Sequence, residues 1–378
     1  NCNTYTIRNL EKNKSHSVIV QFRSADKVQP YYSVEKKIQL NGSDWTILVY
    51  LAAANNLEYY AISDMKEMEK SLLAAGDTPV IILFDRIAGF STGSGNWKDT
   101  KLFELAESTN YYIISSKEIS AERLGLTADY EEDLNMGDSD TLAGFISFCR
   151  DNYTATNYLL VLWNHGDGYR GSAAIDTLSR AICWDDEESS SDPLYTAEFV
   201  SALSNNPVDV IYMDACLMSM VEVAYGLRNS ADFLVSSEFE IPAYGGNYQK
   251  IFNKFNAETN RTGEKIAKIL IDSFYEEFAG KELVTTAIDL SKMDILKNSI
   301  DNLADSLKTM DINSVYNLRM NTTPFYRYTI SYTTNNTNFY NSSLYTYIDI
   351  GHFSALCAAS NISGAAEVLT ALSNAVTA

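Results

Sequence analysis

Short apolar runs alternate with amphipathic stretches through the middle of the chain. The runs have the length of buried strands and lie at Trp45–Ala53, Pro79–Asp85, Asn157–Asn164, Val208–Ala215 and Ala231–Ser236. The stretches between them carry apolar side chains at helical spacing, as at Ser139–Arg150, Tyr195–Ser204 and Leu217–Leu227. Strands that are apolar throughout and alternate with helices are typical of a mainly parallel sheet with helices on both faces. The pattern therefore predicts an α/β fold.

The two ends of the chain differ from this middle part. Residues 1–42 are polar and contain strand-like segments at Ser17–Phe22 and Tyr31–Ile38, which we interpret as an N-terminal arm or hairpin. After residue 290 the elements are less regular and include a strand region rich in Tyr, Asn and Thr. The sequence thus predicts three parts: the arm, an α/β domain at 43–290 and an α+β region at 291–378.

The charge balance excludes several classes of partner. The 378 residues include 29 Lys+Arg and 49 Asp+Glu, which gives a net charge of −20. Nucleic acids and anionic lipid surfaces are bound by clusters of Lys and Arg, which this chain lacks. No apolar run reaches the ~18–20 residues of a membrane-spanning helix. We therefore expect neither a nucleic-acid partner nor a membrane span. We also expect a monomer.

The five cysteines form no recognisable framework. They are Cys2, Cys149, Cys183, Cys216 and Cys357. They are irregularly spaced and contain no Cys-x-x-Cys pair, and the chain has only three histidines. These counts disfavour a disulfide framework and a zinc cage, and at least one cysteine is free. The first residues lack the pattern of a signal peptide, and Cys2 leaves a lipid anchor open.

Two of the predicted strands end in residues suited to catalysis. Asn164–Gly168 follows one strand with the sequence NHGDG, and Asp214–Met218 follows another with DACLM. Ligands of parallel α/β sheets bind beyond the carboxyl ends of the strands, so we expect His165 and Cys216 to meet as base and nucleophile. A helix that begins after Cys216 would favour its thiolate, and its N–H with that of Gly166 could form an oxyanion hole.

Each of these residues also has a purely structural interpretation. A lone cysteine at a strand end is usually a packing residue, and a lone histidine in a Gly-rich loop is usually a turn residue. Finding both at the ends of two strands favours catalysis without deciding the question.

Longer segments resemble a known family. They are WTILVYLAAANNLE, NMGDSDTL, NYLLVLWNHGDGYRG, DVIYMDACLMSMVEVAY and VSSEFEIPAYGGNY, in order over roughly residues 43–250. They resemble the clostripain family of cysteine peptidases, in the caspase-like group with gingipains and legumain. The resemblance implies a caspase-like fold, a thioester mechanism with His165 and Cys216 as a dyad, polypeptide substrates and no required cofactor. It also implies a secreted, periplasmic or cell-surface bacterial protein.

The substrate specificity depends on acidic residues near the cysteine. Asp214 lies two residues before Cys216 and so on the same side of its strand, where a substrate Arg or Lys could pair with it. The resemblance places it in the primary specificity pocket; the alternative is an N-cap of a helix at Leu217. Glu238 could also line this pocket. Tyr244 stands where relatives commonly carry a second acid, which leaves the choice between Arg and Lys open.

Two further expectations concern the loop between the histidine and the cysteine. The resemblance implies self-cleavage there, and Arg180–Ala181 offers the one basic site between Gly171 and Pro207. The alternative is an ordinary surface arginine. The acidic run Asp185–Glu188 could bind Ca²⁺, but a solvated charge run is favoured because the spacing of a calcium loop is missing.

A competing hypothesis belongs to another class. The same scaffold could serve as a catalytically silent secreted or surface binding protein, with the Tyr-rich region Asn321–Tyr347 as its contact surface. The presence of both His165 and Cys216 favours the enzyme.

Overall fold

The computed structural model describes residues 15–22, 32–39, 43–126, 133–169, 182–186, 192–334 and 337–377. For residues 15–22, 32–39, 325–334 and 337–346 it describes only the backbone.

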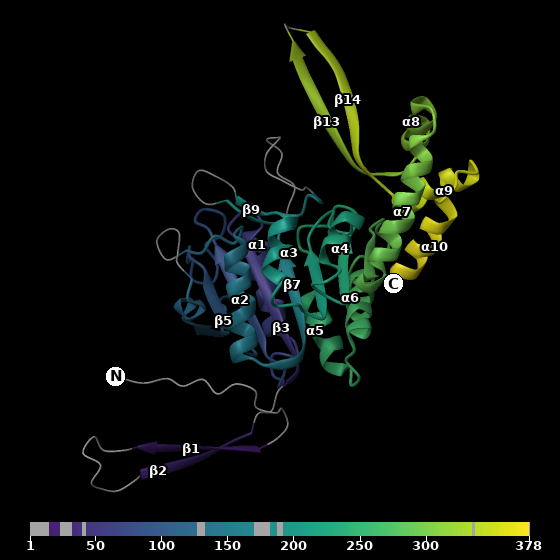
Figure 1. Cartoon of the computed structure of the whole chain (residues 1–378). Coiled ribbons are helices and arrows are strands. Elements are labelled where there is room, and N and C mark those ends of the chain that lie inside the picture. The colour runs from purple at the N-terminus through teal and green to yellow at the C-terminus, as the bar shows by residue number, and fades with distance from the viewer. Residues whose placement is uncertain are drawn as a thin grey trace.

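A large sheet forms the centre of the described chain (Figure 1). Its eight strands follow the order β12-β11-β10-β7-β3-β4-β5-β6. Their bounds are β3 Ser43–Ala53, β4 Val80–Arg86, β5 Lys101–Glu104, β6 Lys117–Ile119, β7 Ala155–Trp163, β10 Val210–Asp214, β11 Phe233–Ser237 and β12 Thr285–Asp289. The five strands from β11 to β4 are parallel, and antiparallel strands flank them at both edges. The predicted α/β class with a mainly parallel sheet is confirmed.

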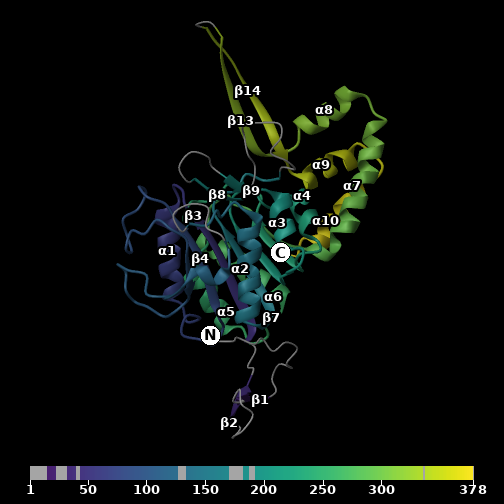
Figure 2. The ribbon, with the colours of Figure 1, turned by 60° about the vertical axis from the view of Figure 1, so that its left-hand side comes forward.

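Helices cover both faces of the sheet (Figure 2). Their bounds are α1 Glu58–Glu69, α2 Ser139–Asn152, α3 Thr196–Leu203, α4 Val221–Leu227, α5 Tyr248–Ala257, α6 Gly263–Glu277, α7 Met293–Lys308, α8 Ile312–Met320, α9 Ile350–Ala359 and α10 Ala365–Ala375. Helices α1, α5 and α6 pack on one face, while α2, α3, α4, α7 and α10 contribute to the core of the other. Two short 3₁₀ helices lie at Ala121–Leu124 and Leu290–Lys292.

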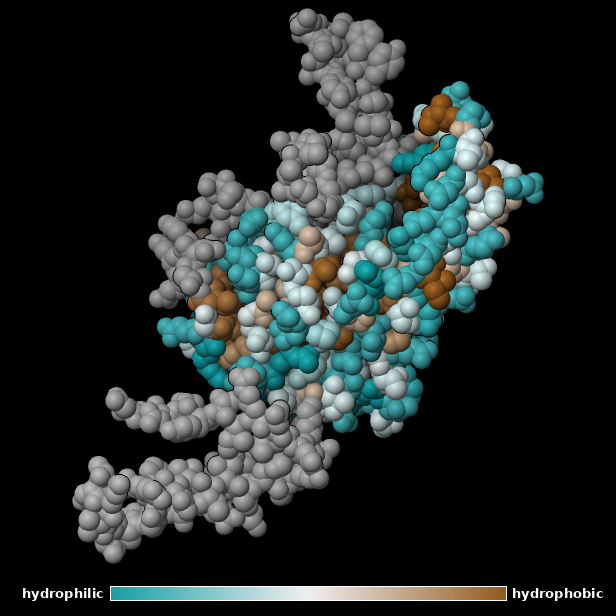
Figure 3. Space-filling view, in the orientation of Figure 1, coloured by the Kyte–Doolittle hydropathy of each residue, from teal (hydrophilic) through white to brown (hydrophobic). Residues whose placement is uncertain are grey.

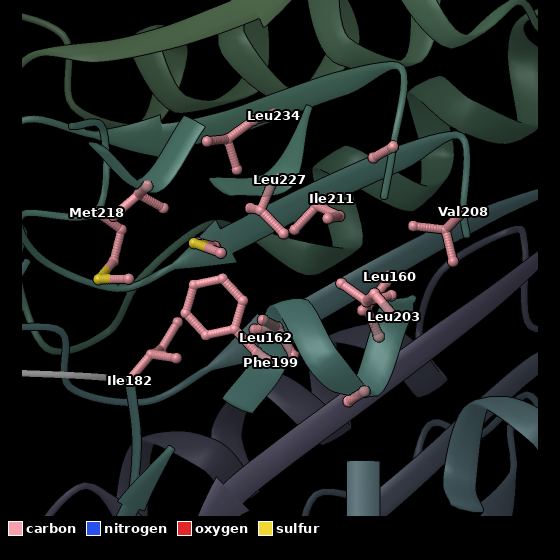
Figure 4. Close-up of a cluster of buried hydrophobic side chains, with 14 of the residues drawn as sticks. Leu160, Leu162, Ile182, Phe199, Leu203, Val208, Ile211, Met218, Leu227 and Leu234 are labelled. Carbon is pink, nitrogen blue, oxygen red and sulfur yellow. The ribbon is translucent and has the colours of Figure 1, made fainter. Parts of the chain in front are cut away.

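The alternation of side chains along β3 explains why its sequence is apolar from Ile47 onward. Leu48 and Tyr50 point into the core of one face, and Ile47 and Val49 into the core of the other. All four are fully buried, so no position of this stretch can be polar at low cost. Figure 4 shows part of the first core, to which Leu203 of α3 and Leu160 of β7 both contribute.

The remaining strands form two-stranded pairs. They are β1 Ser15–Phe22 with β2 Tyr32–Gln39, β8 Ile182–Asp185 with β9 Asp192–Leu194, and β13 Pro324–Thr334 with β14 Thr337–Ile348. All three pairs are antiparallel. The strands expected near the N-terminus are thus present, whereas the domain boundaries at 42 and 290 stay a prediction.

One predicted helix begins later than expected. The pattern predicts a helix over Leu217–Leu227, but α4 starts at Val221. Leu217 has a left-handed backbone (φ 60°), and the segment pairs with the chain after β11 through bonds from the Leu217 N–H to the Phe239 carbonyl and from the Ser219 N–H to the Ser237 carbonyl. An apolar run that is buried as extended chain cannot be told from a buried helix by composition.

The face of the described chain that Figure 3 shows is mostly hydrophilic, with separate hydrophobic patches. Exposed apolar side chains lie at helical spacing along α8, at Ile312, Tyr316 and Met320. None of the described helices has both the length and the apolar character needed to span a bilayer.

Candidate active site

The candidate site lies where two neighbouring parallel strands end. Trp163 and Asp214 are the last residues of β7 and β10 and are direct partners in the sheet. His165 and Cys216 each follow two residues later, so the chain leaves both strands at the same edge. Both residues line a cavity of about 540 Å³ and also a smaller one of about 90 Å³. The structure therefore brings together the two residues that the sequence indicates.

The His165 imidazole is oriented by an asparagine that follows β3. Its Nε2 lies 2.7 Å from Oδ1 of Asn56. Because a carbonyl oxygen only accepts hydrogen bonds, Nε2 carries the proton in this arrangement, and Nδ1 is left as the basic nitrogen. Asn56 is not among the residues that the sequence patterns single out. Its position at the end of a strand next to β7 is the signal that could have identified Asn56.

A buried amide network holds the histidine loop in place. The Asn164 Nδ2 donates to the carbonyls of Ala52 and Trp184, both at 2.7 Å. The Asn164 Oδ1 accepts from the backbone N–H of His165 and from Nδ2 of Asn55 at 3.2 Å. The loop thus has little freedom to rotate, which fixes the direction from which the imidazole enters the cavity.

The Cys216 thiol is half-buried against the loop that follows β11. Its Sγ accepts from the Ile241 N–H at 3.3 Å and lies 3.8 Å from the Ile241 carbonyl oxygen. The expectation that Cys216 begins a helix is wrong, because α4 starts five residues later. The thiolate therefore lacks the stabilisation that a helix N-terminus would supply.

Burial keeps both reactive groups neutral in the free protein. Desolvation raises the pKa of Cys216, opposed by the Ile241 N–H and reinforced by the charges of Glu240, Asp214 and Asp167. Desolvation also lowers the pKa of His165, partly offset by Asp186. A neutral thiol beside a neutral imidazole can react only if the proton moves between them during attack.

Gly166 allows the two loops to approach closely. A Cβ on Gly166 would lie closer to the Cys216 carbonyl oxygen than real Cβ atoms ever do, and 2.9 Å from Cγ of Met218. Any other residue would therefore push the histidine loop away from the cysteine loop. Gly166 and Cys216 line the same cavity, and their role as an oxyanion hole stays a prediction.

Asp214 lines the smaller cavity and is 3% exposed. Its Oδ2 accepts from the Gly246 N–H at 3.0 Å and from the Tyr248 hydroxyl at 2.9 Å. Its Oδ1 is buried and accepts no hydrogen bond from the described residues. Burial raises the pKa of Asp214, and hydrogen bonds from Gly246, Tyr248 and Tyr212 oppose this rise. The alternative of a helix N-cap is wrong, since no helix begins at Leu217.

The other two expected pocket residues lie elsewhere. Glu238 lines a separate cavity of about 420 Å³, where burial and Asp349 raise its pKa to about 7. Tyr244 is 46% exposed, and its ring packs on Phe278 with centroids 5.5 Å apart. In place of Tyr244, its neighbours Ala243 and Gly245 line the cavity beside Asp214.

Two expectations concern parts of the chain that are wholly or partly undescribed. Arg180 and Ala181 lie outside the described residues, so cleavage between them stays a prediction. Of the acidic run, Asp185 accepts from the Met136 N–H at 2.8 Å, and Asp186 lines the larger cavity. Within the described ranges, no group of three or more His, Cys, Asp or Glu side chains could hold a metal ion, and calcium binding stays a prediction.

Comparison with known sequences decides the family. The sequence profile of the clostripain family matches residues 49–377, most of the chain. The chain belongs to the clostripain family. Among curated relatives, clostripain from Hathewaya histolytica is 31% identical over 299 residues, which are 69% of this chain and 56% of the relative. The chain thus spans a little over half the length of that clostripain.

Solved structures of the clostripain family share the fold. A secreted C11 cysteine protease from Bacteroides thetaiotaomicron, in complex with an irreversible peptide inhibitor, has a TM-score of 0.63 at 21% identity. The match covers 89% of this chain and 84% of the chain of that protease. An inactive zymogen C11 protease from Parabacteroides distasonis has a TM-score of 0.63 at 20% identity. The match covers 89% of this chain and 83% of the zymogen chain. The caspase-like fold expected from the sequence is confirmed.

Proposed function

We propose that this protein is a secreted cysteine endopeptidase that cleaves peptide bonds after basic residues, above all arginine. The observation that carries the proposal is the placement of His165 and Cys216 at the ends of neighbouring strands, lining one cavity with the buried carboxylate of Asp214. Membership of a family that is named after a peptidase supports the same conclusion.

The reaction uses Cys216 as the nucleophile and His165 as the base. On attack, the thiol passes its proton to the imidazole and the sulfur bonds to the carbonyl carbon. N–H groups of Gly166 and Cys216 stabilise the negative charge on the carbonyl oxygen. The imidazolium then protonates the amine as the C–N bond breaks, which leaves a thioester. Water hydrolyses the thioester with His165 again as the base, and the thiol is restored.

Asp214 supplies the preference for a basic side chain before the scissile bond. Its Oδ1 is buried beside the cavity and lacks a hydrogen-bond donor among the described residues. A buried carboxylate oxygen is costly unless a donor reaches it, and a guanidinium or ammonium group provides both the donor and the opposite charge. A neutral side chain would leave this oxygen without a partner.

Hydrolysis of fluorogenic peptides with Arg, Lys or Gln before the reporter tests these roles. Cys216→Ala should abolish all turnover, and an Arg chloromethylketone should label only protein that retains Cys216. Asp214→Asn should lower kcat/KM for the Arg substrate about 100-fold while the Gln substrate changes little. Turnover by Cys216→Ala, or an inert wild-type protein, would leave the silent binding protein as the better hypothesis.

Maturation by self-cleavage after Arg180 belongs to the same proposal. Arg180 is the one basic residue between Gly171 and Pro207, in the segment that joins His165 to Cys216. The purified wild-type protein should give two fragments on a denaturing gel, and Arg180→Ala an intact chain. Two fragments of the same size from the variant would refute this site.

A further inference from the structure

A second buried carboxylate lies behind the wall of the smaller cavity. Asp64 of α1 is 2% exposed, and its Oδ2 accepts from Nε1 of Trp163 at 2.8 Å. The Trp163 side chain itself lines the cavity, as does Leu57 just before α1. Asp64 follows Leu57 by seven residues, two helical turns, and so lies on the same side of that helix. Asp64 is thus hydrogen-bonded to a residue of the cavity lining without lining the cavity itself.

The groups that face Asp64 are acidic or phenolic. They are Glu67 on its own helix, Asp214 and Tyr212 on β10, and Tyr248 on α5. Burial, together with the negative charges of Asp214 and Glu67, raises the pKa of Asp64 well above its usual value. In the described part of the chain, no Lys or Arg is among the groups that perturb either aspartate. The two carboxyl groups therefore share a site without a cation.

Their hydrogen bonds decide which of the two stays ionised. Asp214 accepts from the Gly246 N–H and from the Tyr248 hydroxyl, and both bonds favour its carboxylate form. Asp64 accepts only from the Trp163 indole among the contacts of its described neighbours. Two buried like charges in one site cannot both persist at low cost, and the hydrogen bonds favour Asp64 over Asp214 as the group that takes up the proton.

We propose that Asp64 is a second specificity-determining acid: it stays protonated beside ionised Asp214 while the pocket is empty, and it releases its proton to solvent when a guanidinium or ammonium group enters. The inference rests on the proposed function in taking the smaller cavity as the primary specificity pocket. In this proposal Asp64 on α1 provides the second acidic group of the pocket, which Tyr244 does not provide. Substrate binding then exchanges a proton for a cation, and affinity for basic side chains rises with pH.

The test measures binding and not turnover. Cys216→Ala protein is titrated calorimetrically with benzamidine, whose amidinium resembles a guanidinium, over a pH series in two buffers with different ionisation enthalpies. We expect binding with release of up to about one proton per site. In the double variant that also carries Asp64→Asn, proton release should largely disappear, and affinity at the high-pH end should fall about tenfold. In the active enzyme, Asp64→Asn should raise KM for the Arg peptide while kcat changes little.

Two matched variants separate charge from structure. Asp272→Asn removes an acid that pairs with Lys268 on the surface of α6 and should change neither proton release nor affinity. Trp163→Phe removes the hydrogen bond to Asp64 but keeps the carboxyl group, and it should retain proton release. Thermal unfolding of each variant shows whether the fold is intact.

The possible outcomes distinguish this inference from the proposed function. Unchanged proton release in the Asp64→Asn variant overturns the inference and leaves the peptidase in place. If benzamidine binds to Cys216→Ala protein without proton release at every pH, this result alone overturns the inference. If benzamidine does not bind, the basic pocket fails as well, whereas Cys216-dependent hydrolysis of neutral peptides would still support a peptidase.

Discussion

Trp163 and Asp214 are direct partners at the ends of two parallel strands, and this pairing positions the whole site. Two residues further along each chain segment lie His165 and Cys216, so the sheet fixes their approach before any loop contributes. The same register places the Trp163 indole and the Asp214 carboxylate in the wall of the smaller cavity. Under the proposed function, catalysis and specificity therefore both depend on one strand pair.

Replacing Gly166 by alanine should damage the site more than the fold. The added Cβ would overlap the Cys216 carbonyl oxygen, so the histidine and cysteine loops must move apart. We expect kcat to fall more than tenfold and stability to fall by about 1–3 kcal/mol. Peptide hydrolysis and thermal unfolding measure the two effects.

Gly226→Ala is the matched control for this substitution. Gly226 lies within α4, and its added Cβ would meet Val200 and Thr196 only at 3.4 and 3.7 Å, which is ordinary contact. Activity should stay unchanged, and the helix should gain up to about 1 kcal/mol. Equal losses in both variants would contradict the close approach at Gly166.

Removing the Asn56 side chain should affect kcat and leave KM largely unchanged. Asn56→Ala deletes the acceptor at 2.7 Å from Nε2 of His165, which frees the ring to rotate and to change its tautomer. We expect kcat to fall about 10–100-fold, because a base must be positioned to act. Asn298→Ala, on the exposed side of α7, should have no effect. A kcat unchanged by Asn56→Ala would show that other contacts orient the imidazole.

The buried ion pair beside the site should be essential for stability. Arg86 and Glu58 are fully buried, with Nε and Oε1 2.6 Å apart, and they join the end of β4 to the start of α1. Arg86→Met would leave a buried carboxylate without its partner and should cost about 3–5 kcal/mol. Chemical denaturation measures this loss. The double variant Arg86→Met/Glu58→Leu should recover part of it, and no recovery would argue against an unpaired charge as the cause.

The sequence predicts the scaffold and the reactive pair, but not the residues that orient them. Continuous apolar strands and the residues at their ends can be recognised in the amino-acid sequence alone. Strands β7 and β10 and the residues His165 and Cys216 are therefore predictable. The interpretation of Leu217–Met220 as helix failed because Leu217 and Ser219 donate their backbone hydrogen bonds to residues of another segment, Phe239 and Ser237. Asn56 and Asp64 were missed because their importance comes from contacts made across more than ninety positions.

The loop after β11, which contains Tyr244 and Gly245, shows a second limit of prediction from sequence. Tyr244 and Gly245 are adjacent, yet Gly245 lines the cavity beside Asp214 and Tyr244 does not. Gly245 has φ 52°, and a Cβ there would lie 2.6 Å from Oδ2 of Asp214. The turn at this glycine directs the Tyr244 ring outward onto Phe278. Such local backbone geometry is not encoded in a residue's position within a motif.

The reactivity of the Cys216 thiol should continue to rise with pH at pH values above the pKa of an ordinary cysteine. Burial raises the pKa of Cys216, so less thiolate is present at neutral pH than in an unperturbed thiol of pKa 9.0, and the thiolate fraction grows as pH increases through the raised pKa. The rate of alkylation by iodoacetamide, followed by mass spectrometry of the Cys216 peptide, should still be increasing above that value. Glu240→Gln removes one of the charges that raise this pKa and should move the profile to lower pH. A plateau near neutral pH would instead indicate a thiolate–imidazolium pair in the free protein, and the proton would then move before attack.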